Sequence, residues 1–195
     1  MALRFPAAPV VLAGLLCATA PAVAGLPDPS LSTIPNVLAV PGGGSPYSVT
    51  IVGDGGPIAG ATVELRYSAQ GDADACWCVG EPHPNRSAVT NGSGIATFNV
   101  SGGGCLDPAT IAGGVAIEVF VNDIKLKEIG QVSPDVSADP LGTCEVALND
   151  AVQFTGPLAS GTYSYCFDLN SDLVVGLTDA VIFTIPAASA ATCSE

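Results

Sequence analysis

Alternation of apolar and polar residues dominates the chain from about residue 28 to residue 132. It is clearest in five runs, at residues 47–51, 63–67, 95–100, 115–122 and 124–129. Side chains that point in turn to a core and to solvent have this period of two, which predicts half-buried β-strands. The last two runs meet at Asn122-Asp123, which predicts a tight hairpin. About six or seven strands in this length favour a sandwich of two sheets.

Two stretches interrupt this pattern. Pro35 and Asn36 lie in an apolar run that precedes these five. They predict an edge strand that switches between sheets. Residues 72–86 form a long polar insertion with two cysteines, two prolines, the only histidine and Trp77. Loops on rigid sandwiches often bind ligands, so Trp77 is a candidate ligand platform. The alternative is a buried aromatic side chain that packs on a disulfide.

A repeat marks the C-terminal part of the chain. Residues 148–157 recur as residues 177–186, with seven of ten positions identical at an offset of 29 residues. Each copy begins with a leucine and carries an aspartate at its third position, Asp150 and Asp179. We expect each copy to form one short helix that follows a polar loop.

The loop before the second copy has the spacing of a calcium-binding loop. Asp168, Asn170, Asp172 and Asp179 occupy positions 1, 3, 5 and 12 of a twelve-residue window. In such a loop the backbone carbonyl of position 7, here Val174, completes the protein ligands, and position 9 contributes through water. Position 6 is normally glycine but is Leu173 here, which must then adopt a positive φ. The alternative is a polar turn that binds nothing.

The loop before the first copy has a similar but longer pattern. Asp135, Ser137 and Asp139 stand at alternate positions, and Asp150 would supply the returning carboxylate. Ten residues separate Asp139 from Asp150, against six between Asp172 and Asp179, so this loop resembles the other with four residues inserted. We expect its Ca²⁺ site to be the weaker one.

Two tandem loops of this kind, each followed by one helix, resemble the dockerin repeat pair. The resemblance covers residues 134–193, and its most specific parts are residues 168–172 and 177–180. It implies a small α-helical module with EF-hand-type loops that binds Ca²⁺ and docks onto a cohesin-like protein. At the recognition positions this chain has Leu177-Thr178 and Leu148-Asn149, where many dockerins have pairs of hydroxyl residues.

The strand-rich part resembles a bacterial Ig-like domain of the invasin/intimin type. The similarity rests on residues 47–51, on residues 57–65, and on the stretch 90–98, and it covers residues 33–132. It implies a β-sandwich without catalytic chemistry, in cell adhesion or extracellular assembly. Gly60 and Gly94 are expected to occupy backbone conformations that favour glycine.

The first 24 residues have the pattern of a secretory signal. Arg4 is followed by an apolar core at residues 10–18 and by Ala22-Val23-Ala24, a small-residue cleavage site. The core is too short to span a bilayer, although an N-terminal membrane anchor is the alternative. We therefore expect a signal peptide at 1–24, an Ig-like domain at 25–133 and a dockerin-like module at 134–195. The mature chain would have no transmembrane segment and would be secreted or on the cell surface.

Removal of this signal reduces the cysteine count from seven to six. An even number in an exported chain favours disulfides, and three of these residues fall in each half, so at least one bridge should join the halves. Sequence alone does not choose among the pairings. A zinc site made of cysteines and His83 is the alternative. The six residues are Cys76, Cys78, Cys105, Cys144, Cys166 and Cys193.

The net charge and the absence of acyl-transfer motifs limit the classes of function that the sequence supports. The mature chain has 18 acidic residues and, without Arg4, four basic ones, a net charge of −14 that disfavours nucleic acid as a partner. It has no G-x-S-x-G sequence and a single histidine, so an acyl-transfer site is not indicated. We expect a mainly β, non-catalytic exported protein for docking or attachment. The alternative is a small carbohydrate-binding or carbohydrate-active protein of a polysaccharide-degrading system.

Overall fold

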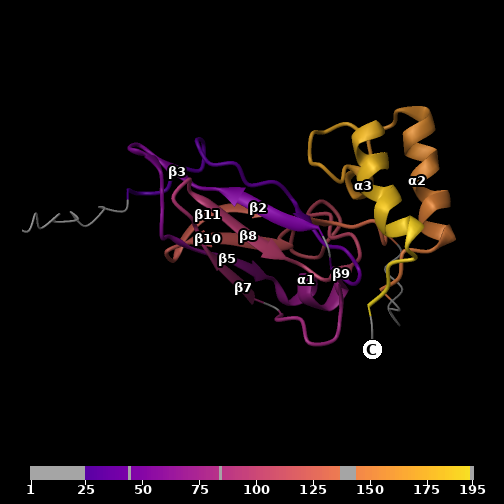
Figure 1. The fold of residues 1–195 in the computed structure, drawn as a ribbon, viewed down its shortest axis with the longest axis horizontal. Helices are drawn as coiled ribbons and strands as arrows, with labels where there is room; N and C mark the ends of the chain where they lie inside the picture. Colours follow the sequence, from indigo (N-terminus) through magenta and orange to yellow (C-terminus); the bar gives the residue numbers. More distant parts are fainter. Residues whose placement is uncertain (1–24, 44, 84, 137–143, 194–195) are drawn as a thin grey trace, which may run out of the picture.

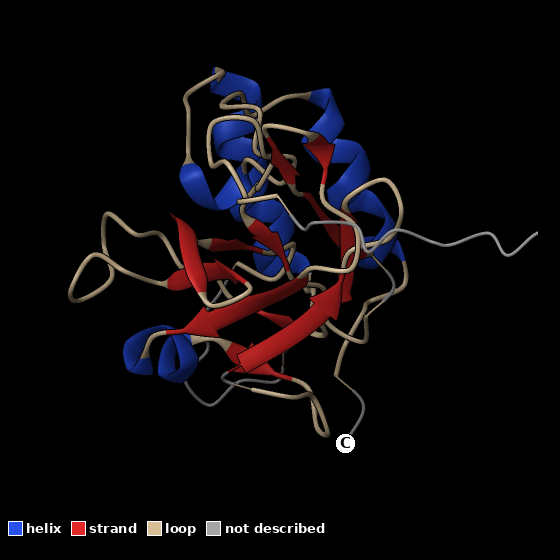
Figure 2. Cartoon of the chain, turned by 90° about the vertical axis from the view of Figure 1, so that its left-hand side faces the viewer, coloured by secondary structure: helices blue, strands red, loops and turns tan. Residues whose placement is uncertain are grey.

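A computed structural model describes residues 25–43, 45–83, 85–136 and 144–193 of the chain. The signal-peptide prediction, and the predicted ligands Ser137 and Asp139, lie outside these residues. The fold is mainly β: all strands in the described residues lie before residue 133, and the two long helices follow. These helices lie together at one end of the strand layers (Figures 1 and 2).

The largest sheet has four antiparallel strands in the order β11-β10-β5-β7. Buried and half-buried residues alternate along β5 from end to end, as the sequence pattern predicts. The hairpin between β10 and β11 turns through Asn122 and Asp123, whose φ angles are 47° and 65°. These positive angles at both central residues confirm the predicted tight turn. The strands are β5 (Thr62–Tyr67), β7 (Asn85–Val89), β10 (Ile117–Val121) and β11 (Ile124–Ile129).

A second layer is built on the antiparallel pair of β2 (Pro46–Thr50) and β8 (Ile95–Asn99). Val49 and Phe98 from this pair join Val63 and Val119 of the four-stranded sheet in one buried apolar cluster. The shorter strands are β1 (Val37–Leu38), β3 (Val52–Gly53), β4 (Gly56–Pro57), β6 (Cys76–Trp77), β9 (Gly102–Gly103) and β12 (Gln131–Val132). The two layers therefore share a single core.

The first extended segment changes its partner, as Pro35 and Asn36 predict. Thr33 forms an antiparallel bridge with Thr50 of β2, whereas Val37 pairs in parallel with Gln131 of β12. Residues 72–86, which the sequence predicts to be a polar insertion, are only partly irregular. The segment contains the end of helix α1 (Ala69–Asp74), all of β6 and the first residues of β7.

The C-terminal part forms helices α2 (Leu148–Ser160) and α3 (Leu177–Ala188), with a short 3₁₀ turn η1 (Tyr165–Phe167) between them. The predicted helix in each copy of the repeat is confirmed. Phe154 and Phe183, which are equivalent in the repeat, stack with their ring centroids 4.8 Å apart. Around them lies a second apolar cluster, distinct from the one between the strand layers. It also includes Val132 of β12 and packs against Leu38 of β1, so the helices share this core with two short strands.

Three disulfides connect this module to the strand layers: Cys76–Cys144, Cys78–Cys193 and Cys105–Cys166. They account for all six predicted cysteines, and every bridge joins one half to the other. Because each cysteine of the candidate zinc site is in a disulfide, the zinc alternative is wrong. Within the described ranges, no helix is both long and apolar enough to cross a membrane.

Candidate functional site

The candidate calcium loop closes on the side chain of Asp168, which is fully buried. One carboxylate oxygen of Asp168 accepts a hydrogen bond from the Asp172 amide at 3.0 Å, and the other accepts one from the Leu173 amide at 2.9 Å. Position 1 of the loop therefore fixes the backbone of positions 5 and 6. This arrangement brings the chain back toward its own start, as a cation-binding loop requires.

Asn170 and Asp172 extend this pattern on the exposed side of the loop. The Asn170 side chain accepts from the Asp172 amide at 3.0 Å and donates to an Asp172 carboxylate oxygen at 2.8 Å. Asp172 in turn accepts from the Val174 amide at 2.9 Å. These are short local turns in which aspartate and asparagine bind the backbone two residues on. They place the predicted ligands of positions 3 and 5 side by side.

Asp179 joins the loop to the helix that follows it. It lies in the first turn of α3, and its carboxylate accepts from the Gly176 amide at 2.9 Å, which satisfies a free N–H at the helix start. Its other oxygen accepts from the Asn170 amide at 3.2 Å. Position 12 is thus held against position 3, as the predicted ligand set demands.

The backbone turns where the sequence predicts. Leu173, at the position that is normally glycine, has a φ of 68°, and Ser171 has a φ of 60°. The predicted positive φ of Leu173 is confirmed. Its side chain remains exposed, so the strained conformation is not offset by burial of the leucine.

The electrostatics of the loop follow from its burial. Burial raises the pKa of Asp168 above its ordinary value of 3.8, and the charges of Asp179 and Asp172 raise this pKa further. Hydrogen bonds from the Leu173 and Asp172 amides oppose this change. The negative charges of Asp172 and Asp179 are therefore close enough to disfavour the charged form of the buried Asp168.

The donor set suits a hard cation. Three carboxylates, the Asn170 amide oxygen and the Val174 carbonyl are all oxygen donors, the class that Ca²⁺ prefers. In the part of the chain that the structure describes, however, no group of three His, Cys, Asp or Glu side chains already has the arrangement of a metal cluster. The carboxylates instead bind backbone amides. A bound Ca²⁺ would supply structural charge neutralisation and no reaction chemistry.

The first loop repeats one part of this geometry. Asp150, in the first turn of α2, accepts from the Ala147 amide at 2.8 Å and from the Val136 amide at 3.1 Å. Asp179 makes the equivalent contact with Gly176 before its helix, but its second bond comes from Asn170 at position 3, whereas Val136 stands at position 2 of the first loop. Asp135 is buried, and its carboxylate lies directly against Gly103 of β9, because a Cβ added to that glycine would collide with it. The structure thus brings Asp150 to the loop but packs Asp135 against the strands.

Both helices expose apolar side chains, of which the sequence pointed only to Leu148 and Leu177, at the recognition positions of the dockerin-like repeat. On α3, Leu177, Val181 and Ile185 are all more than 60% exposed and follow one another at intervals of four residues. Side chains at this spacing lie on one face of a helix. Leu148 and Val152 are exposed at the equivalent positions of α2. The sequence contains the pattern that predicts this exposure, because these apolar residues are spaced so that they lie off the helix face that carries Phe154 and Phe183.

The charge of the module is entirely negative. Residues 134–195 contain eight acidic residues and no lysine, arginine or histidine. Each basic side chain in the described ranges is already bound: Arg66 to Glu64 and Asp123, Arg86 to Glu81, Lys125 to Glu118 and Glu128, and Lys127 to the Ile34 carbonyl. The exposed apolar residues of α2 and α3 therefore lie on an acidic module.

Trp77 is held by contacts within the protein. Its indole N–H donates to an Asp72 carboxylate oxygen at 3.0 Å, and its ring stacks on His83 with centroids 5.6 Å apart. The Arg86 guanidinium lies 4.8 Å from the centre of the ring, and Tyr67 meets it edge-on. These contacts favour the structural interpretation of Trp77 over an open ligand platform.

Searches of protein-family models, of curated proteins and of solved structures each found no match to this chain.

Proposed function

We propose that this protein is an exported, non-catalytic modular protein in which an Ig-like sandwich carries a calcium-binding, dockerin-like docking module. The observation that carries the proposal is the pair of equivalent helices, each preceded by a carboxylate-closed loop and each exposing apolar residues. Folded monomers seldom expose several large apolar side chains together unless the surface contacts a partner.

Calcium binding is supported by the geometry of residues 168–179. The Asp168 carboxylate closes the loop, Asp179 ties it to α3, and Leu173 adopts the positive φ that position 6 needs. Three carboxylates that repel one another would gain from a divalent cation. The first loop receives less support, since Asp135 packs against β9.

Docking is supported by the exposed residues Leu148, Val152, Leu177, Val181 and Ile185. We define these five as the helix surface. The partner that fits it is a cohesin-like extracellular protein with an apolar patch bordered by lysine or arginine, because the module itself is acidic throughout. A second copy of this chain fits less well, since the basic side chains in the described ranges are already bound within the chain.

The carbohydrate alternative has weaker support. It depends on Trp77, whose ring already contacts His83, Arg86 and Tyr67. A sugar that stacks on this indole would have to displace one of these neighbours. The sandwich is therefore better regarded as the carrier of the docking module.

The docking proposal is tested with a panel of recombinant cohesin domains and the oxidised full chain, by biolayer interferometry in calcium buffer. We expect at least one cohesin to bind, and expect Val181→Ser to weaken binding about tenfold or more because it removes an apolar contact at the interface centre. Val89→Ser is the matched control, because Val89 has a similar exposure but lies on β7 of the sandwich. Failure of all cohesins to bind, or equal effects of the two substitutions, would contradict the proposal.

A further inference from the structure

The two ends of the C-terminal module lie side by side. The Cys193 amide donates to the Cys144 carbonyl at 3.0 Å, and the Val146 amide donates to the Ala191 carbonyl at 2.8 Å. Between these bonds, Glu145 and Thr192 form an antiparallel bridge. Residues 144–193 thus form a closed loop whose first and last residues pair with each other.

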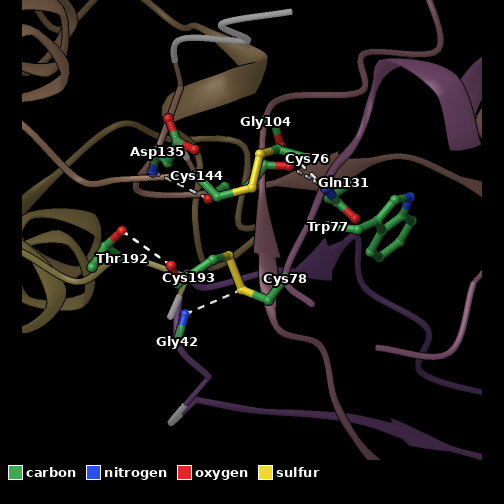
Figure 3. Close-up of a disulfide and its surroundings, with 12 residues drawn as sticks. Gly42, Cys76, Trp77, Cys78, Gly104, Gln131, Asp135, Cys144, Thr192 and Cys193 are labelled. Atoms are coloured by element: carbon green, nitrogen blue, oxygen red, sulfur yellow. Dashed lines mark hydrogen bonds between the residues drawn. A yellow bond between two sulfur atoms is a disulfide. The ribbon is translucent and has the colours of Figure 1, made fainter. Parts of the chain in front are cut away.

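Both ends are attached covalently to one short segment, residues 76–78, which contains strand β6 and the residue that follows it. Cys144 is bridged to Cys76 and Cys193 to Cys78, the two cysteines that flank Trp77 (Figure 3). Strand β6, which contains Cys76, is in turn paired with β9. The attachment point is therefore part of the strand framework and not a free loop.

The third bridge fixes the middle of the module. Cys105–Cys166 attaches the turn η1, two residues before Asp168, to the segment that follows β9. The candidate calcium loop also contacts the sandwich directly, because the Asn36 amide donates to the Ser171 hydroxyl at 3.2 Å. The Cys105–Cys166 bridge and the Ser171 contact thus both tie this loop to the strand layers.

These bridges restrict the unfolded chain strongly. They join residues 68, 115 and 61 positions apart, and the entropy lost by the unfolded chain grows with the length of the closed loop. The negative charges of Asp172 and Asp179 beside the buried Asp168 carboxylate act in the opposite direction when no cation is bound. Disulfides and calcium are therefore two independent means of keeping the same module folded.

We propose that the redox state of the three disulfides decides whether the docking module depends on calcium. With the bridges intact the module stays folded without Ca²⁺, and with the bridges reduced it stays folded only when Ca²⁺ is bound. Reduction needs a dithiol, which gives two electrons and two protons to each bridge, leaves two cysteine thiols and becomes a disulfide itself. The inference rests on the proposed binding of calcium.

Hydrogen exchange of the full chain, measured by mass spectrometry in four states, tests the proposal. The states are oxidised and dithiothreitol-reduced protein, each in Ca²⁺ and in EDTA. We expect EDTA to speed exchange of the α2 and α3 amides by about tenfold or more in the reduced protein, and by less than about threefold in the oxidised protein. Strands β5 and β10 serve as the internal reference, because they are the two central strands of the four-stranded sheet and contain no cysteine.

A double variant, Cys78→Ser with Cys193→Ser, removes one end of the attachment without a reductant. We expect its sensitivity to EDTA to lie between those of the oxidised and reduced chains. If calcium binds but EDTA affects the oxidised and reduced forms equally, the redox proposal is wrong while the calcium site stands. If a calorimetric titration finds no calcium binding in either form, the proposed calcium function itself is wrong.

Discussion

At Gly94 the backbone has a φ of 73°, and a Cβ added there would lie 2.5 Å from the carbonyl oxygen of Ile51. Gly60 has a nearly identical φ of 72° but has open space where a Cβ would stand. Both glycines were expected from the sequence to adopt backbone conformations that favour glycine, and their positive φ angles confirm this. Only the structure distinguishes them, because the close approach at Gly94 comes from a residue far away in the chain.

The two glycines form a matched pair for mutagenesis. We predict that Gly60→Ala costs about 1 kcal/mol, from backbone strain alone. Gly94→Ala should cost more by at least about 1–2 kcal/mol, because the new Cβ also meets the Ile51 carbonyl and forces the backbone to shift. Urea unfolding of the oxidised protein measures both values. Equal losses for the two variants would show that the close approach does not matter.

The buried hydroxyl of Tyr67 donates to the Gln131 side chain at 2.8 Å, and burial raises the pKa of Tyr67 above its ordinary value of 10.0. Since the folded pKa is the higher one, this tyrosine stabilises the fold fully below pH 10 and progressively less as the pH rises above it. We predict that Tyr67→Phe flattens the loss of stability with pH in that range, by at most about 1.4 kcal/mol per pH unit. Unfolding curves at stepped alkaline pH would measure it. An unchanged slope would exclude Tyr67 as the titrating group.

At the scale of the elements, the loop before α3 contains both a strained backbone residue, Leu173, and the candidate calcium ligands. Leu173 is exposed and holds a φ of 68°, so its side chain gains little from burial while its backbone is strained. We predict that Leu173→Gly stabilises the metal-free protein by about 0.5–1 kcal/mol, since glycine relieves the strain but loses more entropy on folding.

The matched control for this loop variant is Leu177→Gly. Leu177 is equally exposed but is the first residue of α3, so glycine there should destabilise the helix. Unfolding in urea with EDTA compares the two. A loss of stability for Leu173→Gly similar to that of Leu177→Gly would mean that the positive φ carries no strain.

Elements with local causes could be predicted, and elements with distant causes could not. The hairpin at Asn122-Asp123 and the helices of the repeat follow from turn chemistry and from the pattern of adjacent residues. By contrast, strand β6 exists because Cys76 and Trp77 pair with Gly103 and Gly102, and no local pattern indicates that pairing. The candidate ligands were chosen from their spacing. Of the helix surface, only Leu148 and Leu177 were named from the sequence, because the repeat was interpreted through its loops and not through the period of its helices.

At the scale of the whole molecule, three disulfides cross-link the strand layers to the helical module. The number of bridges was predictable from the even cysteine count, but their connectivity was not, because each joins residues more than 60 positions apart. The position of the module on the sandwich could not have been predicted without these pairs.

The bridged structure predicts that the protein has no free thiol once the expected signal peptide is removed. Its six cysteines are all paired, and the seventh, Cys17, belongs to the predicted signal peptide. Titration of the denatured, unreduced protein with a thiol reagent should therefore give a value near zero. Two or more thiols per chain would mean that at least one bridge is absent in the secreted form.

The calcium site is the central claim, and calorimetric titration of the oxidised full chain with Ca²⁺ tests it most directly. We predict saturable binding that Asp172→Ala weakens strongly and that Asp54→Ala, an exposed aspartate in the turn between β3 and β4, leaves unchanged. At about 100 times the Kd, bound calcium should also stabilise the module against unfolding by at most about 2.7 kcal/mol. If no heat is seen at millimolar Ca²⁺, or if Asp172→Ala does not alter the titration, the loop at residues 168–179 is a polar turn and the account of this protein as a calcium-binding docking module is wrong.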